Sequence, residues 1–291
     1  MRRIVTPDGL FIYDRSAGTC LFAPDVRSKK WVKPLYAQIA LTNKCNKSCW
    51  FCYNRSSPEG GLEWEPGALK RLIGFLDRWG IFGVSFGGGE PFLYPHLNEI
   101  VRYAWNETGL DVSLTTNGSE GEVAKIDGFV SEVRVSVHDE GSLANLKKFI
   151  GRRFEVGVNL LLFRGGAKRL EKLIEGAMGM GVSDFLVNSF LAVGRGEEYA
   201  EMEPQAQDYA ELAEIIRAHP EATFKVSSRT AKALKDIGGI GRFLPFNRES
   251  SGRIIAITAD GKVKTSSLSE EGYAFSEPEE IPKLYRILAG I

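Results

Sequence analysis

Between residues 35 and 200, short apolar runs alternate with segments in which apolar residues recur every three or four positions. The first pattern is typical of buried strands and the second of amphipathic helices. In the segment 66–79, Leu69, Leu72 and Leu76 lie on one helical stripe, Pro66 opens the first turn and Gly80 follows the last. These features predict a core-facing helix. The same reasoning predicts strands at 35–41, 82–86, 110–115, 130–136, 154–161 and 184–190, and helices at 66–79, 95–106, 119–125, 141–151 and 167–179.

Alternating strands and helices indicate an α/β fold with parallel strands joined by right-handed crossovers. The alternation alone fits an open doubly wound sheet or a barrel. In both architectures ligands bind at the carboxyl ends of the strands. We therefore expect functional residues directly after the predicted strands.

The two ends of the chain follow other patterns. Residues 1–34 predict short strands, with Thr6-Pro7-Asp8-Gly9 as a turn. After Gly194-Arg195-Gly196 the alternation weakens. We divide the chain into an N-terminal strand region (1–34), a central α/β domain (35–205) and a C-terminal extension (206–291). Near and beyond that boundary we expect helices at 204–218, 229–238 and 278–289, a strand at 222–226, and a hairpin of 253–258 with 262–265.

The charge balance restricts the classes of partner. The chain has 37 basic and 37 acidic side chains, a formal net charge of zero, which argues against a general nucleic-acid or membrane-surface protein. It has no apolar run of about 18 residues, and no apolar stretch follows Arg2 and Arg3 as a signal peptide requires. These features predict a cytoplasmic protein without a membrane partner.

Three of the four cysteines, Cys45, Cys49 and Cys52, form a C-x3-C-x2-C motif just after the strand 35–41. So few cysteines without a secretory signal argue against a disulfide framework. Three thiolates hold one face of a metal centre and leave a position open for substrate. The spacing alone favours an iron–sulfur cluster over a zinc site. Cys20 is interpreted as a small buried apolar residue, with a fourth cluster ligand as the alternative.

Polar and glycine-rich segments follow the next three strands. The second strand ends in Gly87-Gly88-Gly89-Glu90-Pro91, where glycines let a ligand approach the backbone, Glu90 offers an acceptor and Pro91 stiffens the exit. By itself this segment is equally explained as a tight turn. The third and fourth strands end in Thr115-Thr116-Asn117-Gly118 and Ser136-Val137-His138-Asp139.

The cysteine motif with Phe51 before its last cysteine, followed by Gly88-Gly89-Glu90-Pro91 and then Thr115-Thr116-Asn117-Gly118, closely resembles the radical S-adenosylmethionine (SAM) superfamily over about residues 35–200. The resemblance implies a partial (β/α)6 barrel with one [4Fe-4S] cluster on the three cysteines. It also implies SAM as cofactor, reductive SAM cleavage, and a 5′-deoxyadenosyl radical that abstracts hydrogen from a small-molecule or peptide substrate. An oxygen-sensitive enzyme of this kind uses a flavodoxin or ferredoxin-type electron donor.

The resemblance also suggests roles for individual residues. The segment that binds the SAM amino group is matched by Gly88, Gly89, Glu90 and Pro91. Phe51 matches the residue whose backbone contacts adenine, and Ser136 matches the residue that contacts the ribose. Three weaker matches near the ribose, adenine and carboxylate of SAM are Asn117, Asn159 and Arg195. No residue is assigned a catalytic role toward the substrate; the candidates are Tyr53, His138 and Asp139. His138 is equally interpreted as a surface histidine on a loop.

Residues 252–266 resemble the SPASM or twitch extensions of radical SAM enzymes, but Ser266 stands where a cluster cysteine is expected. No cysteine follows Cys52, so an auxiliary cluster lacks ligands. Three alternatives stay open: an RNA-modifying radical SAM enzyme, a non-catalytic cluster or zinc scaffold, and a protein that binds a peptide on an exposed apolar edge at 10–14.

Overall fold

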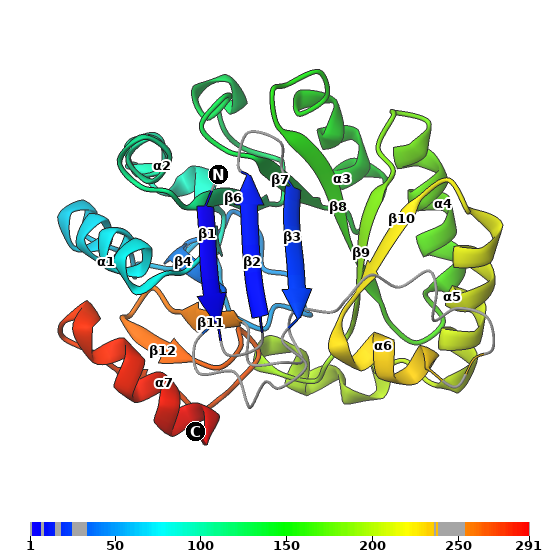
Figure 1. Cartoon of the computed structure of the whole chain (residues 1–291). Coiled ribbons are helices and arrows are strands. Elements are labelled where there is room, and N and C mark those ends of the chain that lie inside the picture. The colour runs from blue at the N-terminus through cyan, green and yellow to red at the C-terminus, as the bar shows by residue number, and fades with distance from the viewer. Residues whose placement is uncertain are drawn as a thin grey trace.

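The computed structural model describes residues 34–235, 237 and 254–290, and the backbone of three strands at 2–6, 9–14 and 19–24. Its main element is a curved sheet of ten strands in the order β10-β9-β8-β7-β6-β5-β4-β11-β12-β13 (Figure 1). The strands are β4 (Tyr36–Thr42), β5 (Gly83–Gly88), β6 (Asp111–Thr116), β7 (Glu132–Ser136), β8 (Glu155–Leu162), β9 (Asp184–Ser189), β10 (Thr223–Val226), β11 (Ile254–Ile257), β12 (Lys262–Lys264) and β13 (Tyr273–Ala274).

Strands β10 through β4, and β11 beside β4, are parallel. Helices lie on the outer side of the curved sheet (Figure 1). They are α1 (Pro66–Trp79), α2 (Leu97–Glu107), α3 (Glu140–Ala144), α4 (Ala167–Met178), α5 (Ala206–Ala218), α6 (Ser228–Leu234) and α7 (Ile281–Ala289). The sheet runs from β10 at one edge to β13 at the other, so among the described strands the barrel is open. The predicted partial barrel is confirmed.

Helix α1 shows how local sequence sets the element bounds. The Glu65 side chain accepts hydrogen bonds from the backbone N–H groups of Gly67 at 2.8 Å and Ala68 at 2.6 Å, which caps the helix start. Gly80 ends the helix with a φ of 90°, in the left-handed region that favours glycine. The helix covers the predicted residues 66–79, and its predicted apolar stripe is buried.

The two faces of the sheet differ in polarity because successive strand residues point to opposite sides. Residues that face the helices, such as Ile39, Phe86 and Leu114, are buried and join the hydrophobic core. Residues on the concave face are partly exposed, and many carry neutral polar side chains: Gln38, Ser85, Ser113, Thr115, Asn159 and Asn188. The core therefore lies between sheet and helices, and the concave face is polar.

The segment 206–291 supplies strands at both edges of this sheet: β10 at one edge, and β11, β12 and β13 at the other. β10 pairs with β9, whereas β11 pairs with β4 and forms the predicted antiparallel hairpin with β12. The predicted C-terminal helix is present as a 3-10 turn, Pro278–Glu280, followed by α7. The predicted helices at 119–125 and 141–151 are shorter than expected: a 3-10 turn at Val123–Lys125, and α3 continued by a 3-10 turn at Asn145–Lys148. The division at residue 205 stays a prediction, although hydrogen bonding is continuous across it.

Strands β1 (Arg2–Thr6), β2 (Gly9–Asp14) and β3 (Thr19–Pro24) form a separate antiparallel sheet, as expected for residues 1–34. Cys20 belongs to β3, but its side chain and the suggested apolar edge at 10–14 lie outside the described side chains. In the part of the chain that the structure describes, no helix combines the length and apolarity needed to cross a membrane.

Candidate active site at the mouth of the open barrel

The three cysteines of the motif lie on residues 43–62, the cysteine loop, which connects β4 to α1. Backbone hydrogen bonds close this loop on itself: Asn43 N–H donates to Leu62 O and Cys45 N–H to Ser57 O, both at 2.9 Å. A side chain at Gly60 is excluded because its Cβ would lie 2.4 Å from Asn43 O. The loop is therefore a compact platform at the carboxyl end of β4.

Cys45, Cys49 and Cys52 are half-buried, and each carries a free thiol. Burial raises the pKa of Cys45 and Cys49, and the negative charges of neighbouring cysteines raise both pKa values further. Three thiolates that repel one another are stabilised by a cation that binds all three. The donor set fits a metal centre with three sulfur ligands.

The glycine-rich end of β5 packs directly on the start of this loop. Gly89 N–H donates to Thr42 O at 2.7 Å and Glu90 N–H to Lys44 O at 2.9 Å. A Cβ at Gly88 would lie 2.5 Å from Thr42 O, and one at Gly89 would lie 2.0 Å from Lys44 O. At these two glycines the space is filled by the protein's own backbone. Only at Gly87 in this run is the space open, with no atom within 4 Å.

Glu90 is fully buried. Its Oε1 accepts from Thr116 Oγ1 at 2.7 Å and from Phe92 N–H at 3.2 Å, and its Oε2 accepts from Asn117 N–H at 2.8 Å. Burial raises the pKa of Glu90, while these three donors act in the opposite direction. The carboxylate therefore ties the end of β5 to the end of β6, which the sequence reasoning did not foresee.

Asn117, after β6, reaches the cysteine loop. Its Nδ2 donates to Asn46 Oδ1 at 2.9 Å and lies 3.9 Å from Cys45 Sγ. An N–H near a ligating sulfur tunes a metal centre. The predicted residue is thus beside the cysteines.

Phe51 and His138 are in contact, with ring centroids 4.6 Å apart in an edge-to-face arrangement. His138 is partly buried and its Nδ1 is buried without a hydrogen-bond partner among the described residues. Burial, with the positive charges of Arg169 and Lys47, lowers the pKa of His138 to about 4. His138 is therefore a partly buried ring packed on Phe51 of the cysteine loop, and its lowered pKa favours the neutral form.

The other two candidates for chemistry occupy different surroundings. Asp139 is exposed and accepts from Ser142 N–H at 2.6 Å, which caps α3, and this bond lowers the pKa of Asp139. The side chain of Tyr53 is on the surface of the cysteine loop, 43% of the residue being exposed. In the structure, Asp139 therefore acts as the N-terminal cap of α3.

Arg195, in the segment after β9, binds the cysteine loop. Its Nη1 donates to Cys49 O at 2.7 Å and its Nη2 to Ser56 O at 2.9 Å, while its backbone N–H donates to Cys52 O at 3.0 Å. Arg195 thus lies beside the cysteine loop, and its expected contact with SAM stays a prediction. The guanidinium group of Arg195 therefore donates hydrogen bonds to backbone carbonyl oxygens of the loop.

Ser136 and Asn159 are register partners on β7 and β8, at the carboxyl end of the sheet. Arg134, buried on the same face, donates from Nε to Asn159 Oδ1 at 2.8 Å and pairs with Asp184 at 3.0 Å. A Cβ at Gly157 would lie 2.5 Å from Arg134 Nη1. The sequence reasoning missed Arg134, although an arginine inside an apolar strand was an available signal.

Comparison with known proteins places the chain in a family. Residues 39–208, more than half of the chain, match the family model of the radical SAM superfamily. The chain belongs to this superfamily.

Two curated relatives have GTP 3′,8-cyclase names. The GTP 3′,8-cyclase of Chlorobaculum tepidum is 37% identical over 84 residues, 28% of this chain and 26% of the relative. The probable GTP 3′,8-cyclase of Methanococcus maripaludis is 30% identical over 139 residues, 43% of this chain and 47% of the relative. The matched regions thus span less than half of either relative.

Solved structures show the same fold at low sequence identity. Streptococcus suis SuiB has a TM-score of 0.70 at 12% identity, over 99% of this chain and 89% of that one. Native anSMEcpe with bound AdoMet has a TM-score of 0.55 at 14% identity, over 81% and 76% of the two chains. Radical SAM enzymes use a [4Fe-4S] cluster and SAM, so the expected enzyme class and cofactors are confirmed.

Proposed function

We propose that Cys45, Cys49 and Cys52 hold the [4Fe-4S] cluster and that the barrel mouth beside them binds SAM. The observation that carries this proposal is the presence of three half-buried free thiols on one loop. The start of that loop is hydrogen-bonded to the glycine-rich end of β5, and Cys45 Sγ lies 3.9 Å from Asn117 Nδ2. When bound, the cluster supplies the electron for reductive cleavage of SAM, and the resulting 5′-deoxyadenosyl radical abstracts hydrogen from the substrate.

In this proposal the protein's own residues position the cofactors. Glu90 acts through its three hydrogen bonds, which hold the backbone after Gly87 in place, so that backbone groups of this segment contact the SAM amino group. Both oxygens of the Glu90 carboxylate already accept hydrogen bonds from protein donors. Arg195 acts in the same way, by fixing the loop that carries the cysteines.

The adenosine part of SAM is assigned to the region between the cysteine loop and strands β7 and β8. Phe51 contributes its backbone, Ser136 meets the ribose, and Asn159 lies toward adenine. Ser136 and Asn159 are neighbours on adjacent strands, which supports a shared ligand. Pro91 stiffens the chain after the glycine-rich segment.

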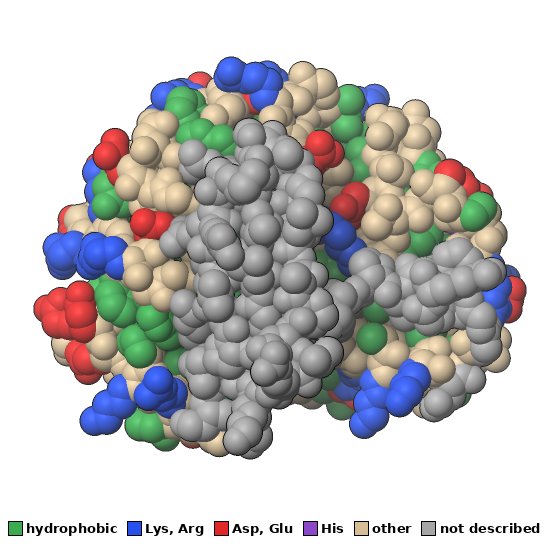
Figure 2. All heavy atoms as spheres, in the orientation of Figure 1, with side chains coloured by type: hydrophobic (Ala, Val, Ile, Leu, Met, Phe, Trp, Pro, Cys, Tyr) green, Lys and Arg blue, Asp and Glu red, His purple; other side chains and the backbone are tan. Residues whose placement is uncertain are grey.

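The substrate is a small molecule or a peptide. The concave face presents neutral polar side chains such as Gln38, Ser85 and Ser113, while Arg134 and Lys225 are both paired with Asp184. This favours a substrate with hydroxyl or amide groups. On the face shown in Figure 2, the described acidic and basic side chains are interspersed around the rim, which gives no support to an RNA substrate.

The remaining assignments are part of the same proposal. The electron donor is a flavodoxin or ferredoxin-type protein, and the enzyme acts in the cytoplasm, where thiols stay reduced. Residues 206–291 form a SPASM- or twitch-like extension without an auxiliary cluster. Tyr53, His138 and Asp139 carry no assigned step.

Anaerobic reconstitution tests this proposal. We expect about four irons per chain and, with dithionite and SAM, formation of 5′-deoxyadenosine. Cys49→Ala should abolish the cluster colour and the deoxyadenosine, whereas the matched Cys20→Ala should retain both. Survival of both signals in Cys49→Ala would contradict the ligand assignment. Zinc in place of iron, or a cluster without SAM cleavage, would favour the scaffold alternative.

A further inference from the structure

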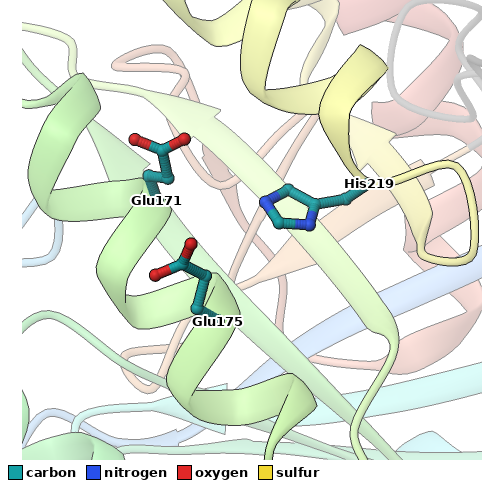
Figure 3. Close-up of side chains that lie close together, drawn as sticks. All are labelled: Glu171, Glu175 and His219. Carbon is teal, nitrogen blue, oxygen red and sulfur yellow. The ribbon is translucent and has the colours of Figure 1, made fainter.

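Three side chains that can bind a metal ion converge on the outer surface of the barrel, away from the cysteine loop. Glu171 and Glu175 lie four residues apart on α4, and His219 directly follows α5 (Figure 3). One ligand atom from each residue lies within 4.8 Å of the other two. Two elements thus bring two carboxylates and an imidazole together.

The imidazole lacks a partner where it faces this group. His219 Nε2 is buried and has no hydrogen-bond partner among the described residues. In Figure 3 one ring nitrogen points toward α4 and its two glutamates. His219 Nδ1 lies 3.8 Å from a carboxylate oxygen of Glu221. A buried ring nitrogen without a partner costs free energy unless another atom binds it.

The two carboxylates also have no ion-pair partner among the described residues. Like charges four residues apart on a helix repel each other. Within the described ranges, no ion pair joins Glu171 or Glu175 to a lysine or arginine. The group therefore combines two carboxylates without a described ion pair and a buried ring nitrogen without a described hydrogen-bond partner.

We propose that Glu171, Glu175 and His219 Nε2 bind a divalent zinc ion. Carboxylate oxygen and imidazole nitrogen are ordinary zinc ligands, and three protein ligands leave the fourth position to water. An imidazole ligand favours zinc over magnesium or calcium. Glu221, beside Nδ1, has the place of the carboxylate that orients a zinc-bound histidine. The ion joins α4 to the turn between α5 and β10, and this site is independent of the proposed SAM chemistry.

The test uses cobalt(II) as a spectroscopic substitute for zinc, added anaerobically to protein whose cysteines already hold the cluster. We expect one equivalent of Co²⁺ to give weak visible bands without thiolate charge transfer, and Zn²⁺ to displace it. His219→Gln and Glu171→Gln should each weaken binding by about tenfold or more. Glu214→Gln, a surface glutamate on α5 with a 75% exposed side chain, should bind as the wild type.

A second readout separates metal binding from a folding defect. Zn²⁺ should raise the melting temperature of the wild type and of Glu214→Gln, but not that of Glu175→Gln, an exposed position. The proposal is overturned if the wild type binds no Co²⁺, if His219→Gln and Glu175→Gln bind with wild-type affinity, or if all cobalt bands have thiolate character.

Discussion

The neutral ring of His138 makes a quantitative prediction about stability against pH. Its pKa is lowered from 6.5 to about 4 by burial and by two nearby cations. The unfolded chain therefore takes up the proton at a higher pH than the native state does. The stabilisation is complete above pH 6.5 and is lost as pH falls toward 4. One pKa unit corresponds to about 1.4 kcal/mol, so the loss at about pH 5 is about 2 kcal/mol.

Urea unfolding of the wild type and His138→Leu, with the same cluster content, measures this effect. Leucine keeps an apolar contact with Phe51 and cannot be protonated. Between about pH 7.5 and about pH 5, the wild type should lose about 2 kcal/mol more unfolding free energy than the variant. Parallel pH profiles for wild type and His138→Leu would refute the reasoning.

Three further predictions concern hydrogen bonds of the site and its support. Glu90→Gln replaces one buried acceptor by a donor and should cost about 2 kcal/mol, a fall of about 4–8 °C in melting temperature; an unchanged melting temperature would show that the three bonds are dispensable. Arg134→Ala should weaken SAM binding about tenfold, and the double variant Arg134→Ala/Asn159→Ala should bind SAM no more weakly than Asn159→Ala alone. Equilibrium dialysis measures both affinities. If the two losses add, Arg134 acts separately from Asn159. The hydrogen bond from Arg229 lowers the pKa of Glu203, so the stabilisation from this pair is present above the ordinary glutamate pKa and is lost as pH falls through the lowered value. The unfolding free energy of Glu203→Gln, measured in urea, should therefore depend less on acid pH than that of the wild type. The same pH dependence in both proteins would contradict this.

Much of the barrel was predictable because its signals are local. The segment 66–79 carries its own cap, proline and apolar stripe, and its bounds agree with the structure. The six central strands were predicted with errors of no more than two residues at either end. Apolar runs bounded by turns can be recognised without knowledge of the rest of the chain. The cysteine motif and the polar strand ends were found for the same reason.

Contacts between distant segments were not predictable in this way. The pairing of β10 with β9 and of β11 with β4 joins residues of the C-terminal segment to opposite sides of one sheet, and no local pattern specifies a pairing partner. The burial of Glu90 depends on donors from Thr116 and Asn117, at the end of the next strand along the chain. The guanidinium of Arg195 binds carbonyls that precede it by 139 and 146 residues.

This last separation has a consequence for how the enzyme matures. The cysteine loop leaves the ribosome first, and Arg195, which holds the carbonyls of Cys49 and Ser56, follows 146 and 139 residues later. At about 5–20 residues per second, this interval is roughly 7–30 s. Throughout it the nascent thiols lack their clamp and are open to oxidation or to stray metal ions. In the proposed ligand assignment, insertion of the iron–sulfur cluster is therefore best timed after translation of the barrel, when the loop has its final shape.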